Sequence, residues 1–161
     1  MDSVVRFKGF FPLNLHTYII YCLQRWLYWS DWGSVAKIEK ASMDGENRTV
    51  IHDSDLVEPN GLTLDYDQLV LYWIDAYRDM IECSSVNGSN RRVVSSERIF
   101  QPFDISFYRG TLYFTDLLTG VNKVASNGGT VTTVFSSHHL CSETVGIEVV
   151  TSEQQPTGML L

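Results

Sequence analysis

The sequence lacks the motifs that most readily identify an enzyme. It contains no G-x-S-x-G nucleophile motif, no H-E-x-x-H zinc motif, no P-loop and no G-x-G-x-x-G dinucleotide motif. The stretch DSDLVE at 53–58 has two acids of a calcium loop but lacks the glycine and the length of such a loop. We therefore expect a protein that is not an enzyme and that needs no cofactor.

Long apolar runs and clustered basic residues are also absent. No run of roughly 18 apolar residues occurs, so we expect no membrane-spanning helix and no direct membrane insertion. The 12 Lys and Arg residues are outnumbered by 19 Asp and Glu, which argues against a nucleic-acid partner. The acids concentrate within residues 31–82, which favours a basic protein ligand; the alternative is a solvated surface that keeps the chain soluble.

The sequence does contain a short aromatic and acidic stretch that recurs. LYWSDW begins at Leu27, LYWIDA at Leu71 and LYFTDL at Leu112, so equivalent positions lie 44 and 41 residues apart. A period of about 20–50 residues indicates a repeat architecture. An Asp-Gly or Asn-Gly dipeptide follows each copy in the same register, at 44–45, 87–88 and 127–128.

Inside one repeat the local signals favour strands. GLTLD, LVLYWID, MIECSSV and RRVVSS are short, rich in β-branched and aromatic residues, and separated by turn residues. The Asp-Gly and Asn-Gly dipeptides supply the positive φ angles of a tight hairpin between the third and fourth strands. We therefore expect an all-β fold, in which each repeat is a four-stranded antiparallel blade of a β-propeller.

The repeat register divides the chain into segments. We expect a non-repeat N-terminal segment over 1–16, a partial propeller over 17–150 and a C-terminal tail over 151–161. The expected blades span about 17–53, 61–96 and 102–136, with a closing strand at 144–150.

One acid recurs beside the aromatic residues, as Asp31, Asp75 and Asp116. A buried, unpaired charge would cost several kcal/mol. We therefore expect these acids to be structural and to accept hydrogen bonds from backbone donors of a neighbouring strand or blade. The alternative is a ring of metal ligands or catalytic acids.

Cysteine is scarce, and the three residues cannot form a complete disulfide framework. We expect Cys22, Cys83 and Cys141 to be unpaired structural thiols. In the repeat register Cys83 replaces Lys40 and Lys123, so partial exposure is expected at Cys83. Residues 138–139 and Cys141 lie too close together for the usual spacing of zinc ligands, so no metal site is expected.

At these residues the sequence resembles a known family. LYWSD, LYWID and LYFTD, with their Asp-Gly or Asn-Gly turns and the upstream EPNG and QPFD, are similar to the YWTD (class B) repeats of the low-density lipoprotein receptor family. The resemblance covers about residues 25–155 and is strongest to the lipoprotein-receptor-related proteins, including the Wnt co-receptors. It implies a six-bladed propeller, of which about three blades are present here.

The resemblance also implies a function. We expect a non-enzymatic, extracellular, ligand-binding propeller from an endocytic or Wnt co-receptor type of receptor. Its parent receptor would place it on the extracellular side of the plasma membrane or in the secretory pathway, since the segment GFFPLNLHTYIIYCL is a poor signal peptide. The alternatives are a nidogen-like matrix-binding scaffold and a calcium-dependent propeller hydrolase.

The same resemblance implies a binding face for extracellular protein or peptide ligands. Loops before the first strand and after the second strand of each blade would form it. The expected ligand-binding residues are Trp32, Glu58, Asn60, Ala76, Tyr77, Arg78, Phe103 and Asp104. Asn60 matches a family asparagine that can bind an asparagine of a peptide ligand, and Trp32 would offer an apolar platform. The alternative for Pro-Asn-Gly is a turn that contacts no ligand.

Two further expectations concern the surface. Asn47 and Asn87 lie in N-x-S/T sequons at the hairpin between the third and fourth strands, where a glycan would be accessible. Three blades in place of six would leave two apolar blade faces open, so we expect self-association through them.

Overall fold

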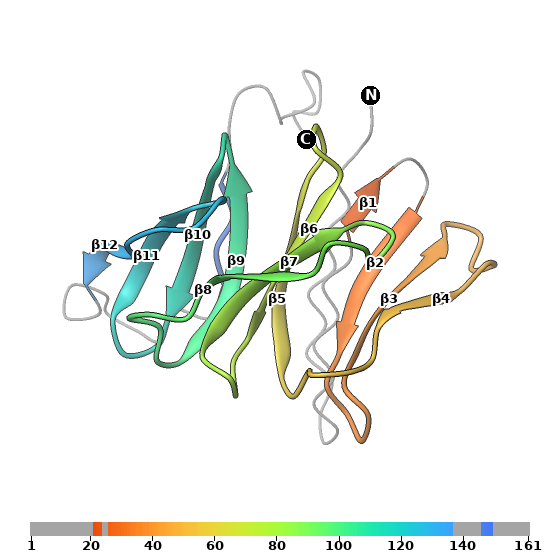
Figure 1. The fold of residues 1–161 in the computed structure, drawn as a ribbon, viewed down its shortest axis with the longest axis horizontal. Coiled ribbons are helices and arrows are strands. Elements are labelled where there is room, and N and C mark those ends of the chain that lie inside the picture. Colours follow the sequence, from red (N-terminus) through yellow and green to blue (C-terminus); the bar gives the residue numbers. More distant parts are fainter. Residues whose placement is uncertain (1–20, 24–25, 137–145, 150–161) are drawn as a thin grey trace, which may run out of the picture.

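The computed structural model describes residues 21–23, 26–136 and 146–149, which form three four-stranded antiparallel sheets side by side (Figure 1). Blade 1 consists of β1 (Tyr21–Leu23), β2 (Trp26–Asp31), β3 (Lys37–Ser42) and β4 (Thr49–His52). Blade 2 consists of β5 (Pro59–Asp65), β6 (Val70–Asp75), β7 (Met80–Ser85) and β8 (Arg92–Ser95). Blade 3 consists of β9 (Pro102–Tyr108), β10 (Thr111–Asp116), β11 (Gly120–Ala125) and β12 (Thr132–Ser136).

The described residues confirm the expected all-β fold. In each sheet the strands pair in chain order, and the three sheets are consistent with part of a six-bladed propeller. Blade 2 begins at Pro59, slightly before the expected residue 61. The segments 1–16 and 151–161 lie outside the described residues, as does Cys141.

The three blades repeat in detail. The second and third strands pair Tyr28 with Lys40, Tyr72 with Cys83 and Tyr113 with Lys123. A register shift recurs next to the same position of the third strand, between Ile38 and Glu39, Ile81 and Glu82, and Val121 and Asn122. The hairpin glycines Gly45 and Gly88 have φ angles of 86° and 89°, as the Asp-Gly and Asn-Gly turns require.

Blade 2 packs on both of its faces, against blade 1 and against blade 3. We call the side that carries the repeat tyrosine (Tyr28, Tyr72 or Tyr113) the front face, and the side that carries the next aromatic residue (Trp29, Trp73 or Phe114) the rear face. Tyr28 of blade 1 shares a buried apolar cluster with Trp73 of blade 2, and Tyr72 of blade 2 shares another with Phe114 of blade 3. The front faces of blades 1 and 2 therefore pack on the rear faces of blades 2 and 3. Burial on both sides explains why these strands do not alternate between apolar and polar residues.

The exposure expected for Cys83 is wrong. Cys83 is a free thiol at 2% exposure within the cluster between blades 2 and 3, and burial raises the pKa of its thiol. The lysines at the equivalent positions mislead because a long side chain can carry its charge past the edge of a buried face. A cysteine side chain is too short to do so.

The first strands of the blades lie side by side. The Phe107 amide of β9 donates to Thr63 Oγ1 of β5 at 3.1 Å. The Val149 amide donates to Ser106 Oγ at 3.2 Å, so residues 146–149 follow β9 as β9 follows β5. A Cβ at Gly61 would lie 2.8 Å from the Asp104 Cα, so this close approach requires glycine in β5.

Candidate ligand-binding face

One end of the three blades is built from five connecting loops, which we call the loop face. In an antiparallel blade, the turn after the second strand and the link to the next blade emerge at the same end. The loop face comprises residues 32–36, 53–58, 76–79, 96–101 and 117–119. The Ala76 amide donates to the Glu58 carbonyl at 2.8 Å and the Leu117 amide to the Gln101 carbonyl at 2.9 Å, so each turn is tied to the preceding link.

The repeated acids accept hydrogen bonds from the backbone amides of these loops and so fix the loop conformations. Asp75 accepts from the amides of Val57 and Glu58 in the preceding link, at 2.8 and 3.1 Å, and from the Arg78 amide in its own turn at 3.2 Å. The carboxylate is fully buried, so these donors replace water. The geometry supports a structural role, with donors that come from connecting loops instead of a neighbouring strand.

Asp116 repeats this arrangement in blade 3. It accepts from the amides of Phe100 and Gln101 in the preceding link, and from Leu118 and Thr119 in its own turn. Asp31 of blade 1 accepts from the Gly33 amide at 3.0 Å. In the part of the chain that the structure describes, no group of three or more His, Cys, Asp or Glu side chains could hold a metal ion.

An arginine pair fixes the link between blades 1 and 2. Arg91 donates to the carbonyls of Ser54 and Asp55, at 2.6 and 2.7 Å, and forms a forked contact with Glu82. Arg78 also reaches the Asp55 carbonyl and Glu82. The guanidinium of Arg91 lies over the Trp73 ring, 5.3 Å from its centroid. This link is therefore held rigidly from two sides.

The loop face exposes a set of large apolar side chains. They are Val35, Val57, Tyr77, Phe100, Leu117 and Leu118. Tyr77 is the most exposed, at 70%, and Leu118 is exposed at 59%. The sequence predicts these loops as the binding face, but of this set it predicts only Tyr77 as a contact residue. Apolar residues directly after the repeated acid or before the next first strand were the signal that could have found the others.

The exposed charges between these side chains are mainly acidic. Asp53, Asp55 and Glu97 are exposed, with Arg98 as an exposed base beside Glu97. Partial burial raises the pKa of the Asp79 carboxyl, and the negative charge of Asp116 raises it further. The face therefore combines apolar side chains with negative charge.

The structure separates the expected ligand-binding residues into two groups. Those on the loop face itself, all half-buried or exposed, are Trp32, Glu58, Ala76, Tyr77 and Arg78. The others lie at the beginning of a first strand and are Asn60, Phe103 and Asp104. Asn60 is 7% exposed, and its side-chain oxygen has no hydrogen-bond partner.

Asp104 differs from the expectation. It is 1% exposed, and its oxygens accept from the amides of Ile105 and Ile147, both at 2.9 Å. The side chain therefore binds the segment that follows β9 instead of facing solvent. We leave Asp104 out of the contact surface, because a ligand at the loops would not reach it.

The two sequon asparagines lie at the opposite end of the blades. Asn47 and Asn87 are exposed in the β3–β4 and β7–β8 turns. Asn87 Oδ1 accepts from the amide and hydroxyl of Ser89, whereas Asn47 Nδ2 donates to Ser42 Oγ. A glycan at either position would leave the loop face open.

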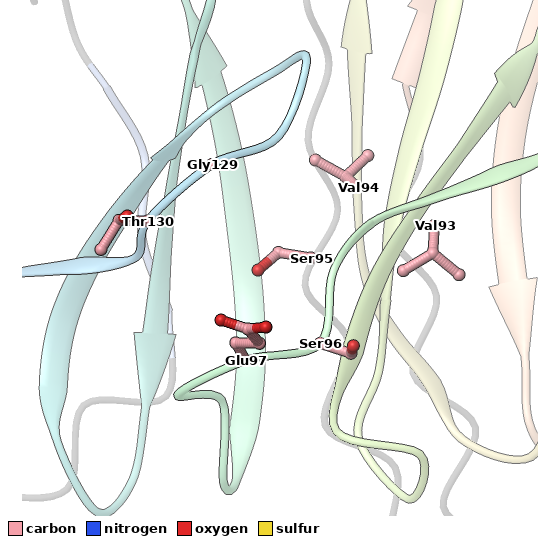
Figure 2. Close-up of a pocket in the computed structure, with 7 residues that line it drawn as sticks. All are labelled: Val93, Val94, Ser95, Ser96, Glu97, Gly129 and Thr130. Carbon is pink, nitrogen blue, oxygen red and sulfur yellow. The ribbon is translucent and has the colours of Figure 1, made fainter.

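A cavity of about 430 Å³ lies between β8 and the β11–β12 connection (Figure 2). Its lining residues are Val93, Val94, Ser95, Ser96, Glu97, Gly129 and Thr130. The polar groups are hydroxyls and one carboxylate, with no histidine, cysteine or lysine among them. This lining offers no nucleophile paired with a base, and it does not support catalysis.

Comparison with known proteins finds a similarity at the first blade. Residues 25–66, from β2 to β5 with the turn residue after it, match the family model of the low-density lipoprotein receptor repeat class B. The aromatic and acidic pattern of this segment recurs in the other two blades.

The relatives that are similar in sequence include receptors. The vitellogenin receptor of Solenopsis invicta is 39% identical over 90 residues, which cover 56% of this chain and 5% of that receptor. The protein cueball of Drosophila yakuba is 33% identical over 100 residues, which cover 60% of this chain and 16% of cueball. The chain thus spans a small part of the relatives that it matches.

Two solved structures share the fold. A chain in a nidogen–laminin complex is 27% identical with a TM-score of 0.67, over 74% of this chain and 49% of that chain. A gluconolactonase from Xanthomonas campestris is 19% identical with a TM-score of 0.60, over 76% of this chain and 48% of that chain. The second likeness shows the fold alone. The closer resemblance to Wnt co-receptors stays a prediction.

Proposed function

We propose that this chain is a non-enzymatic, extracellular, ligand-binding part of a lipoprotein-receptor-type protein, and that its loop face binds a protein ligand. The class B repeats and the similarity to vitellogenin receptors support this type of protein. No membrane-crossing helix occurs in the part of the chain that the structure describes.

The exposed Tyr77 on a fixed backbone carries the proposal. Its turn is held by two hydrogen bonds. The Ala76 amide donates to the Glu58 carbonyl on one side, and the Arg78 amide donates to the Asp75 carboxylate on the other. An aromatic side chain on a rigid backbone loses little entropy when a partner covers it. Tyrosine is also enriched among residues that dominate binding energy at protein interfaces.

Asn60 gives the face a polar anchor. Its backbone carbonyl already accepts from Ser30 Oγ at 3.4 Å, whereas its side-chain oxygen lacks a partner. A buried acceptor without a donor is costly, by about 1–3 kcal/mol. The oxygen is buried, so an amide donor from a ligand would remove this cost only if binding opened the site, in the role that the family resemblance implies for Asn60.

The charge of the face suggests the chemistry of the ligand. Exposed acids at Asp53, Asp55 and Glu97 would attract a ligand with lysine or arginine beside its apolar contacts. Vitellogenin is the first probe because the similar receptors carry its name. Laminin is the second, because nidogen in the matching structure is in complex with laminin.

The test is calorimetric titration of the chain with vitellogenin and, separately, with laminin. We expect Tyr77→Ala and Phe100→Ala each to weaken binding by roughly tenfold or more, as for interface anchors. Met43→Ala is the matched control, because Met43 is an exposed apolar residue in the β3–β4 turn, away from the loop face.

Each outcome of this titration separates the alternatives. Binding of laminin without vitellogenin would favour the nidogen-like scaffold over the receptor. Binding of neither protein, or an equal effect of Met43→Ala, would reject the loop face as the binding surface.

A further inference from the structure

The interface between blades 2 and 3 differs from that between blades 1 and 2 at one position of the fourth strand. The register places Ser95 of β8 where β4 has His52. The His52 ring packs on Trp73, with 5.1 Å between ring centroids, and shares a hydrogen bond with Ser84 Oγ. A serine side chain is too short to make such contacts across the interface. The cavity of Figure 2 lies beside Ser95, between blades 2 and 3.

The Ser95 side chain brings a hydroxyl without a partner to this cavity. A register shift leaves Val94 without a partner in β7, so that Val94 and Ser95 both face blade 3. Ser95 is 7% exposed, and its hydroxyl makes no hydrogen bond in the part of the chain that the structure describes. In Figure 2 this hydroxyl points toward the carboxylate of Glu97, which forms no ion pair with a described residue.

The link that follows β8 repeats the link that follows β4. The links 53–58 and 96–101 have equal length, so Glu97 and Arg98 stand where the first link has Ser54 and Asp55. Asp55 and Arg98 also have similar positive φ angles, of 52° and 58°. In the first link the carbonyls of Ser54 and Asp55 accept from the guanidinium of Arg91, at 2.6 and 2.7 Å. This backbone conformation therefore presents two carbonyls to a guanidinium group.

Blade 3 supplies no base to the second link. The residue equivalent to Arg91 is Val131, which is 4% exposed within an apolar cluster. Among the described residues, none donates a hydrogen bond to the carbonyl of Glu97 or of Arg98. The second interface therefore keeps the carbonyl acceptors of the first, adds the carboxylate of Glu97, and lacks the guanidinium.

We propose that the cavity between blades 2 and 3 binds the guanidinium group of an arginine side chain from a protein ligand. The carboxylate of Glu97 pairs with the cation, and the carbonyls of Glu97 and Arg98 accept from it as the first link accepts from Arg91. The hydroxyl of Ser95 accepts a further N–H. A guanidinium has five N–H donors in a fixed fork and no acceptor, which matches a site made of acceptors. The volume of about 430 Å³ is in the range of roughly 300–1,000 Å³ that is usual for ligand pockets.

This site deepens the function proposed above, because it gives a basic side chain of the ligand a defined place. Residues 96 and 97 belong both to the cavity and to the loop face, so a ligand on the loop face reaches the cavity along this link. The inference rests on the proposed function only for the source of the arginine. The site itself is tested with arginine compounds alone.

The test is an NMR titration of the chain with Nα-acetylarginine amide, which carries the side chain as a peptide does. We expect shifts of the amide signals of residues 94–98. Nα-acetylcitrulline amide has the same shape without the charge and should not bind. Methylguanidinium represents a small-molecule source and should bind more weakly, because it lacks the methylene groups that contact Val93 and Val94.

Two variants and a matched control locate the site. Glu97→Gln keeps the shape of an exposed side chain and should weaken binding by roughly tenfold or more, the effect of losing a charged hydrogen bond. Ser95→His installs the residue of blade 1, fills the space and should weaken binding to a similar degree. Asp53→Asn removes an exposed acid from the neighbouring link, where Arg91 is already bound, and should change little. If Ser95→His fails to fold, the contrast between Glu97→Gln and Asp53→Asn still decides.

Three results would overturn the site. They are a citrulline compound that binds as tightly as the arginine compound, an equal response of Glu97→Gln and Asp53→Asn, and signal shifts confined to residues outside the cavity. Methylguanidinium binding as tightly as the arginine compound would replace the protein ligand by a small guanidinium compound.

The titrations with vitellogenin and laminin separate this inference from the loop-face proposal. Binding of the arginine compound but of neither protein would support the site and reject the loop face. Binding of either protein with an affinity that Glu97→Gln leaves unchanged would support the loop face and overturn the use of the cavity by that ligand.

Discussion

Blades 2 and 3 have the same strands and register but differ at one buried polar position of the third strand, which is charged in blade 2 and uncharged in blade 3. In blade 2, Glu82 is paired with Arg91, which lies over Trp73. The equivalent positions of blade 3 hold Asn122, Val131 and Phe114. All three positions differ between the blades: blade 2 has an ion pair that lies over an aromatic ring, and blade 3 has three uncharged residues.

The uncharged version is as fully satisfied as the charged one. Asn122 Oδ1 accepts from Thr133 Oγ1 at 2.8 Å, and Asn122 Nδ2 donates to Thr119 Oγ1 at 2.8 Å. Val131 is 4% exposed within the cluster between blades 2 and 3. What differs is the neighbouring link. Arg91 binds the loop that enters blade 2, whereas a valine has no donor to offer the loop that enters blade 3. The charged version therefore adds control of a binding loop, which the fold itself does not need.

The largest expected effect on stability comes from removing Arg91, the basic member of the ion pair in blade 2. Arg91→Val leaves Glu82, with a side chain only 6% exposed, without its main partner. Removing one member of a buried ion pair costs about 3–5 kcal/mol, and the remaining contact with Arg78 should hold the loss near about 3 kcal/mol. Urea unfolding measures this loss.

A triple variant that carries the residues of blade 3 in blade 2 tests whether the two arrangements are interchangeable. The triple variant Glu82→Asn, Arg91→Val and Val93→Thr places the residues of blade 3 in blade 2, because Val93 pairs with Glu82 as Thr133 pairs with Asn122. It should be more stable than Arg91→Val alone, since no buried carboxylate is left without its main partner. A triple variant as unstable as the single one would show that the two versions are not interchangeable.

The second expected effect concerns the acid that both blades share. Asp75→Asn keeps the shape of the side chain but removes the charge that three backbone amides solvate. We expect a loss of about 1.5–3 kcal/mol, the range for hydrogen bonds to a charged group. Asp116→Asn should behave in the same way in blade 3. An unchanged urea midpoint for both variants would contradict a structural role for the repeated acids.

The fold was predictable because it repeats. Each aromatic and acidic stretch marked a second strand, and each Asn-Gly or Asp-Gly marked a hairpin. The strands predicted in one blade were therefore supported by equivalent strands in the others. The misplaced residues are those where the repeats disagree. Cys83 stands where other blades have lysine, and Asp104 stands where β5 has Gly61. Their burial depends on the neighbouring blade and on residues 146–149, which one repeat read alone does not reveal.

The loop face was predictable in outline only. The position of Tyr77 after the repeated acid placed it on a turn, and it is exposed there. Leu118 lies in the equivalent turn of blade 3 and Phe100 in the link that precedes it, but their exposure depends on how the loops of two blades meet. The 61% exposure of Phe135 was equally hidden, because a single repeat does not show what lies against a blade face.

The smallest expected effect comes from His52 of blade 1, whose equivalent position in blade 3 holds Phe135. Burial lowers the pKa of the His52 imidazole, and the positive charge of Arg91 lowers it further, while Glu82 and Asp53 oppose this. The ring also faces Trp73 and shares a hydrogen bond with Ser84 Oγ at 2.9 Å. Since the folded chain holds the proton less well than the unfolded chain, low pH favours unfolding. The contribution of His52 to stability is complete above the ordinary histidine pKa of about 6.5 and is lost as the pH falls through the lowered value.

The variant that isolates this effect is His52→Phe, which places the residue of blade 3 at the contact between blades 1 and 2. Ser84 Oγ remains bonded to the Ser85 carbonyl at 2.9 Å, so the substitution leaves no hydroxyl without an acceptor. We expect the urea midpoint of the unaltered chain to fall more steeply between about pH 7 and pH 5 than that of His52→Phe. The other three histidines are common to both chains and cancel in the difference. Parallel pH profiles for the two chains would show that His52 holds its proton equally well folded and unfolded, and that the contact between blades 1 and 2 is as insensitive to pH as an all-apolar one.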